Sequence, residues 1–164
     1  MISQTAEYAL RAVVHLGYVY PNSCTTQQVA TATKVPPHYL AKVLRDLARA
    51  RLVRSQRGLR GGFALRRSPA ELTVFDVLEA VDPPLRIHEC PLGLRAHAHQ
   101  LCPLHSKLDH AMAKTEEAFR STTIADVTAP GPRQPLREVA TTLTISPGLA
   151  PGRNGKHKKR KRAR

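Results

Sequence analysis

Residues 36–53, PPHYLAKVLRDLARARLV, and residues 54–65, RSQRGLRGGFAL, follow each other directly and decide the fold. In the first stretch apolar residues recur at i, i+3, i+4, i+7 and i+8, which predicts an amphipathic helix with basic side chains on its wet face. In the second, glycines between two short apolar runs predict a turn between two strands. Such a helix can enter a DNA major groove, and an Arg/Gly hairpin can reach the neighbouring backbone or minor groove. We therefore expect a recognition helix followed by a wing.

The flanking sequence supplies further helices. Ser3 is the expected N-cap of a first helix that runs to about Tyr20, where Pro21 and Asn22 end it. The patterns T-x-x-Q from Thr25 and T-x-x-D from Thr73 predict capping boxes at two further helix starts. The expected fold class is mainly α with a small β wing, a winged helix-turn-helix domain over residues 1–82.

Charge is distributed unevenly along the 164 residues, which carry a formal net charge of +14. Residues 1–70 hold 11 Lys and Arg against two acids, residues 71–150 hold seven against ten, and residues 151–164 add eight cations. This concentration at the recognition elements and at the C-terminal end is typical of a polyanion binder. We expect DNA contacts from Thr25, Thr26, Gln27, His38, Tyr39, Lys42, Arg45, Arg57 and Arg60.

Several classes of protein are excluded or disfavoured. No run approaches the roughly 18 consecutive apolar residues of a membrane span, and the N-terminus does not read as a secretory leader. A cytoplasmic location without membrane association is expected. Three cysteines predict reduced thiols or metal ligands rather than a disulfide scaffold. Cys24, alone beside a helix start, is expected to be a small packed residue.

The chain loses its apolar periodicity in residues 83–103 and gains cysteines and histidines there, which predicts a ligand-bearing loop. Pro103 then opens a long helix over residues 104–127, and its apolar seam is too long for so small a domain to cover alone. Dimerisation through this helix is the expected solution. Residues 128–164 are rich in Pro and Gly and end in KHKKRKRAR, so we expect a disordered basic tail that binds phosphate without reading sequence.

Taken together, TAEYALRAV, PPHYLAKVLRDLARARLV, SQRGLRGGFAL, TVFDVLEAVD and a Cys-bearing loop before a final helix resemble the Rrf-two family of bacterial winged-helix regulators, of the IscR/NsrR-like kind. The likeness covers residues 1 to about 127, and RG-x-x-GG-F-x-L is its most specific part. The resemblance implies a homodimer paired through the C-terminal helix. In sensor members of the family, a bound cluster sets DNA affinity.

The same resemblance implies a ligand set. Relatives that bind a cluster carry C-x5-C-x5-C, some with a histidine three residues after the last cysteine. Here Cys90, Cys102 and His105 keep the outer positions, but the middle position is Ala96. Other relatives take a carboxylate from the partner's first helix, which corresponds to Glu7.

His97 lies close to these positions in the sequence and is a further candidate ligand. Thiolates and imidazoles suit zinc as well as iron, so both metals stay open on the residues alone. The family pattern favours a 2Fe-2S cluster, and histidine ligation of such a cluster has precedent.

The sequence thus predicts a sequence-specific transcriptional regulator, a repressor that senses redox or nitric-oxide status through a Cys/His metal centre. The alternative is a cluster-free relative whose DNA binding is constitutive or switched by its thiols. A metal-dependent hydrolase using the His-rich loop is disfavoured, because no carboxylate pair, nucleophile and base pair or HExxH helix accompanies the histidines. We expect no enzymatic activity.

Overall fold

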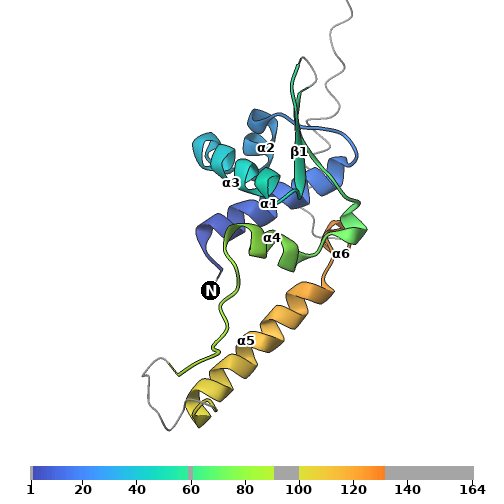
Figure 1. Ribbon diagram of the computed structural model, residues 1–164. Helices are drawn as coiled ribbons and strands as arrows, with labels where there is room; N and C mark the ends of the chain where they lie inside the picture. The colour runs from blue at the N-terminus through green and yellow to red at the C-terminus, as the bar shows by residue number, and fades with distance from the viewer. Residues whose placement is uncertain (1, 59–60, 91–99, 132–164) are drawn as a thin grey trace, which may run out of the picture.

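The computed structural model describes residues 2–58, 61–90 and 100–131. The chain is mainly helical with one small sheet, as predicted (Figure 1). In chain order the elements are α1 (Gln4–Val19), α2 (Thr26–Thr33), α3 (Pro37–Arg49), β1 (Val53–Gln56), β2 (Gly62–Leu65), the 3-10 turn η1 (Pro69–Glu71), α4 (Val74–Val81), α5 (Pro103–Ser121) and α6 (Ile124–Thr128).

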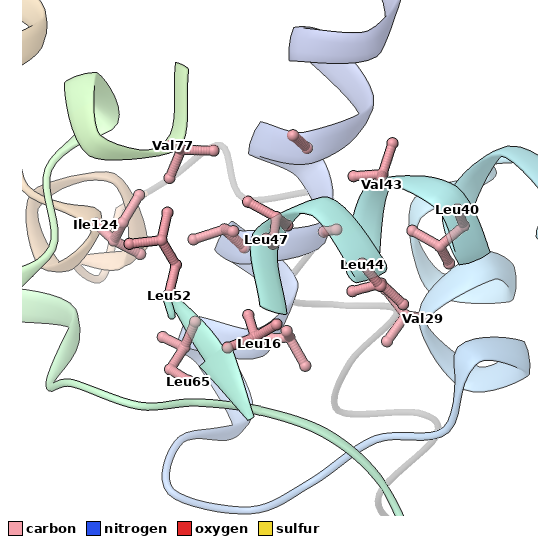
Figure 2. Packing of buried hydrophobic residues seen from close by; sticks show 14 of the residues in the cluster. Leu16, Val29, Leu40, Val43, Leu44, Leu47, Leu52, Leu65, Val77 and Ile124 are labelled. Atoms are coloured by element: carbon pink, nitrogen blue, oxygen red, sulfur yellow. The ribbon is translucent and has the colours of Figure 1, made fainter. Parts of the chain in front are cut away.

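The core is built around α1, which contacts α2, α3, α4 and α6. Figure 2 shows Leu16 of α1 facing Leu44 and Leu47 of α3, with Leu52 and Ile124 beside them. All five side chains are at most 5% exposed. Burying a leucine or isoleucine side chain stabilises a fold by about 1.5–3 kcal/mol, so this shared core holds the helices in one arrangement.

The predicted helix starts are confirmed. The Ser3 side chain accepts a hydrogen bond from the Ala6 N–H, and α1 ends at Val19. Thr25 and Thr73 each form a capping box, with Gln28 and Asp76 as the third helical residues. Each box satisfies two backbone donors that a helix start otherwise leaves without partners, which fixes where α2 and α4 begin.

The hairpin is antiparallel, and its register runs from Val53 opposite Leu65 to Gln56 opposite Gly62. Its turn is closed by a 2.8 Å hydrogen bond from the Gly61 N–H to the Gly58 carbonyl. Cys24 extends the ladder, because its N–H donates to the Phe63 carbonyl at 2.9 Å and its carbonyl accepts from the Phe63 N–H at 2.7 Å. The hairpin is thereby joined to the segment between α1 and α2.

The prediction of one helix over residues 104–127 was wrong. The long helix α5 ends at Ser121, and Thr123 caps the short helix α6 in a box with Asp126. Ile124 is fully buried, and its N–H donates to the Leu72 carbonyl at 2.7 Å. Burial of this isoleucine under α1 favours a turn over continued helix. Neither α5 nor any other helix in the described ranges could cross a membrane.

The hairpin's attachment makes Gly62 intolerant of a side chain. A Cβ atom at this position would lie 2.3 Å from the Cys24 carbonyl oxygen, and its φ is +148°. At Gly58 the φ is +104°, but nothing lies within 4 Å. Gly62→Ala should therefore lower the free energy of unfolding by at least about 2 kcal/mol, and Gly58→Ala by only about 1 kcal/mol from backbone strain. Urea denaturation of both variants checks this, and equal losses would contradict the steric reason.

His15 is a buried polar residue of α1. It is 1% exposed, and neither ring nitrogen has a hydrogen-bond partner among the described residues. Burial disfavours the charged imidazolium and lowers the pKa of His15 below its ordinary value of 6.5. The folded protein therefore holds this ring neutral while the unfolded chain takes up a proton.

Because the folded-state pKa is depressed, the stability that depends on His15 is present above about pH 6.5 and declines as the pH falls below it. The free energy of unfolding should fall between pH 7 and 5 with a contribution of up to about 1.4 kcal/mol per pH unit. His15→Leu should remove that contribution and flatten the curve. Urea titrations at several pH values test this, and an unchanged slope in the variant would assign the pH dependence to other groups.

Candidate DNA interface and Cys/His cluster

The start of α2 carries the first predicted contact residues. Thr25 and Gln27 are exposed and Thr26 is half-buried. The Thr25 hydroxyl accepts from the Gln28 N–H at 3.2 Å, and the Gln28 side chain accepts from the Thr25 N–H at 2.8 Å. Thr25 thus fixes the helix start, and its position still exposes the partial positive charge that helix N-termini present to phosphate.

In α3 one face is buried and the other is basic. Leu40, Val43, Leu44 and Leu47 are at most 2% exposed, whereas Lys42 and Arg45 are exposed and form no ion pair with any described residue. The second and third turns of the helix therefore present two cations to solvent. This is the arrangement that a recognition helix needs for major-groove contact.

His38 and Tyr39 lie at the exposed start of α3. Tyr39 is 51% exposed, and its ring meets the Tyr8 ring of α1 edge-on, with centroids 6.2 Å apart. The His38 and Tyr39 rings lie 4.5 Å apart. Contact with Tyr8 limits the motion of Tyr39, so this aromatic pair is a partly ordered surface at the N-terminal end of α3.

The hairpin presents its own exposed residues. Val53 is buried, whereas the remainder of β1 and Arg57 after it are exposed. Arg60 lies outside the described residues. Arg54 of β1 is also exposed. It is a further cation of the hairpin, which the prediction from the sequence did not include. Hydrogen bonds from the Leu52 N–H to the Leu47 carbonyl and from the Arg66 N–H to the Leu52 carbonyl join α3 to the hairpin.

These elements lie together at one end of the molecule. Figure 1 places α2, α3 and the hairpin on one side of α1, and α5 extends from the opposite side. The basic face of α3, the start of α2 and the hairpin can therefore meet one DNA duplex without interference from α5. Together they define a winged helix-turn-helix arrangement.

A second cluster lies at the start of α5. Cys102 is the N-cap of α5, and its Sγ lies 3.3 Å from His105 Nδ1. Cys90 Sγ, from the segment that follows α4, lies 3.9 Å from the same nitrogen. Both thiols thus lie near the same imidazole nitrogen, although they come from two parts of the chain.

The donor atoms can be compared with the requirements of a metal. In tetrahedral geometry, bonds of about 2.3 Å to a thiolate and about 2.0 Å to an imidazole separate sulfur and nitrogen by about 3.5 Å. The two distances to His105 bracket this value. Among the described residues, however, no group of three or more Cys, His, Asp or Glu side chains closes around a common point. Each sulfur–nitrogen pair thus lies near the separation that a shared metal requires, but a complete set of ligands is not formed by the described residues.

The two other predicted ligands do not complete the set within these residues. Glu7 Oε1 accepts from Arg11 Nε at 2.8 Å on the surface of α1, so within one protomer this carboxylate is engaged elsewhere. His97 lies outside the described residues. Cys24 is packed against the core, and burial raises the pKa of its thiol, which keeps it protonated and unreactive.

The exposed face of α5 is apolar in part. No residue of this wholly described helix is buried, and Leu104, Leu108 and Met112 are 64%, 44% and 38% exposed. A groove of about 460 Å³ lies beside it, lined by Ile2, Leu78, Pro84, Met112 and Phe119 among others. Met112 and Phe119 of α5 line the groove, so the helix and the groove adjoin each other.

The fold and the exposed basic elements define the class of protein, a winged-helix DNA-binding transcriptional regulator. Residues 2–130 match the family model Rrf2, described as an iron-dependent transcriptional regulator. The chain belongs to the Rrf2 (Rrf-two) family, whose members are transcriptional regulators rather than enzymes.

Among its relatives is an HTH-type transcriptional regulator of Mycobacterium tuberculosis, Rv1287, which is 34% identical over 128 residues, covering 77% of this chain and 80% of that protein. Two solved structures share the fold. CymR, the global cysteine regulator of Bacillus subtilis, matches with a TM-score of 0.68 at 23% identity, over 79% of this chain and 96% of that chain. IscR of T. potens matches with a TM-score of 0.65 at 23% identity, over 77% of this chain and 85% of that chain.

Proposed function

We propose that this regulator is a homodimeric, cytoplasmic repressor whose affinity for a specific DNA operator responds to redox or nitric-oxide status through a Cys/His-ligated 2Fe-2S centre. The observation that carries the proposal is the convergence of Cys90 and Cys102 on His105 Nδ1. The family's description as iron-dependent favours iron over zinc at these ligands.

Cys90, Cys102 and His105 would hold the centre, and Glu7 of the partner subunit or His97 would supply the fourth ligand. A bound centre of this type would supply an electron-accepting group whose reduction potential is set by its ligands and surroundings. The ligating residues would also join two parts of the chain. Cys102 is the N-cap of α5 and Cys90 lies in the segment between α4 and α5, so ligation by both would hold that segment against the start of α5.

A second copy of the chain is the expected occupant of the apolar surface on α5. Leu104, Leu108 and Met112 repeat at i, i+4 and i+8, and their exposure in the single protomer is unusual for a folded domain. The adjoining groove is lined by apolar side chains of α4 and α5, and Asp82, Thr115 and Glu116 add polar groups to it. Pairing of two protomers through this surface would set the distance between two recognition helices, which must match operator half-sites about one helical turn apart.

DNA recognition is assigned to the exposed side chains at the opposite end. Lys42 and Arg45 on α3 would face the major groove, and Arg57 on the hairpin would reach the backbone or minor groove. Thr25, Thr26 and Gln27 would contact phosphate at the start of α2. His38, Tyr39 and Arg60 complete the proposed set.

Replacing Arg57 or Lys42 with alanine should weaken operator binding by about 1–3 kcal/mol each, because each removes a charge-assisted contact from an exposed side chain. The probe is a duplex enriched from a random library by the wild-type protein, and binding is measured by fluorescence anisotropy. Lys114→Ala, which removes an exposed cation from α5, is the matched control and should not change the affinity. Unchanged binding in both variants, with intact circular dichroism, would remove this DNA face.

The alternative is a cluster-free regulator with constitutive or thiol-switched DNA binding. Ala96 in place of a middle cysteine and the incomplete donor set favour it. In that case Cys90 and Cys102 would act as thiols, and the regulator would contain neither iron nor sulfide.

Anaerobic reconstitution separates the two functions. Wild-type protein should bind iron and sulfide in equal amounts and absorb in the visible, and loss of the centre should change operator affinity by about 5- to 150-fold. Cys90→Ala, Cys102→Ala and His105→Ala should each lose iron and colour, because each removes one ligand. Cys24→Ala is the control and should retain both. Colourless wild-type protein, or full occupancy in both cysteine variants, would favour the cluster-free regulator.

A further inference from the structure

Arg86 attaches the segment between α4 and α5 to α5. Arg86 Nε donates to Asp109 Oδ1 at 2.7 Å, and Arg86 Nη2 donates to Asp109 Oδ2 at 2.8 Å. The Ile87 N–H donates to the same Oδ1 at 3.0 Å. Both oxygens of one carboxylate on α5 are thus held by two consecutive residues of the segment, a geometry that fixes direction as well as distance.

The contact continues along α5 to the winged domain. Arg86 Nη1 donates to Glu116 Oε2 at 3.3 Å, and Arg120 Nε donates to Glu116 Oε1 at 2.8 Å. The Arg120 guanidinium stacks over the Phe75 ring of α4, 3.4 Å from its centroid. Phe75 is only 6% exposed, so the network ends in the core.

This network differs from the surface ion pairs of the protein. The side chains of Arg86, Asp109 and Glu116 are 29%, 20% and 17% exposed, compared with 40% and 47% for Arg11 and Glu7. Exposed pairs of the second kind contribute little to a fold. The hydrogen bonds from Arg86 and the Ile87 N–H hold the pKa of Asp109 well below its usual range. Asp109 is therefore ionised, and the contact persists, throughout the physiological pH range.

The position of the network relative to the Cys/His cluster gives it a role. Asp109 lies one helical turn after His105, and Glu116 continues the same face of α5. Cys90 follows Arg86 by four residues. The arginine therefore fixes the segment against α5 immediately beside the point where the Cys90 thiol meets His105.

We propose that Arg86 is the positioning residue of the Cys/His cluster: it holds Cys90 against Cys102 and His105, and through Glu116, Arg120 and Phe75 it ties the state of the cluster to the winged domain. The link to DNA affinity rests on the proposed function. The positioning role does not, because it concerns where two thiols lie in the protein whether or not a metal is bound.

The positioning role is tested on metal-free protein carrying Cys24→Ala, equilibrated with reduced and oxidised glutathione. Glutathione disulfide takes two electrons and the two thiol protons from Cys90 and Cys102, which form a disulfide, and is released as two glutathione molecules. The equilibrium constant measures the effective concentration of one thiol at the other. Arg86→Ala and Asp109→Asn should each lower it about tenfold. Arg49→Ala, which breaks an ion pair on α3, should leave it unchanged.

Thermal melts of each variant separate this effect from general unfolding. The variants Arg86→Ala and Asp109→Ala and their combination form a double-mutant cycle. The combined variant should lower the effective concentration of the thiols no more than either single variant does. An effective concentration equal to that of the parent in folded Arg86→Ala and Asp109→Asn proteins would overturn the positioning role. Additive losses of effective concentration in the double variant would also overturn the positioning role, since the two side chains would then act separately.

The link between the Cys/His cluster and the winged domain is tested with a separate variant. Arg120→Ala breaks the contact with Phe75 and leaves the pair of Arg86 and Asp109 intact, so the thiol equilibrium should change by less than about twofold. The ratio of DNA affinities of the reduced and disulfide-bonded proteins should fall towards one. A ratio equal to that of the parent would overturn this link. Absence of iron from the wild type would instead count against the proposed centre alone, because neither measurement uses iron.

Discussion

The burial of one stripe of α3 decides which part of this protein can meet DNA. Leu40, Val43, Leu44 and Leu47 fill the space between α1 and α2, so α3 can rotate about its axis only at the cost of exposing leucine. Lys42 and Arg45 face solvent for this reason alone. The same packing sets the start of the hairpin, because the Leu52 N–H is bonded to the Leu47 carbonyl.

The C-terminal end of α5 is held by the opposite side of the same core. The Val74 N–H donates to the Thr122 carbonyl at 2.9 Å, and Ile124 is buried against α1 near Gly17. From this attachment α5 extends outward, and its N-terminal end carries Cys102 and His105. In the proposed function, the state of the Cys/His cluster would act on α5 at this end, while the other end stays fixed in the core.

Local signals in the sequence predicted most of the elements. Thr25, Thr73 and their partners three residues on were sufficient to place α2 and α4, since a capping box acts within one turn. The same pattern at Thr123 and Asp126 caps α6 and ends the long helix earlier than predicted. Arg86 was not predicted, since its partner Asp109 is 23 residues away and no periodicity relates them. Glu7 was assigned as a ligand although Arg11, one turn later, is its partner within the protomer.

The pairing of Cys24 with Phe63 has a consequence for how binding specificity can change among related regulators. Because two backbone hydrogen bonds join the hairpin to the segment that leads into α2, the hairpin and the start of α2 belong to one rigid unit. A substitution that tilts the hairpin to follow a different groove width would also shift the phosphate contacts proposed for the start of α2. Altered operators are therefore reached more readily by exchanging side chains on α3 than by reshaping the hairpin, and natural variation in target sequence should concentrate on that helix.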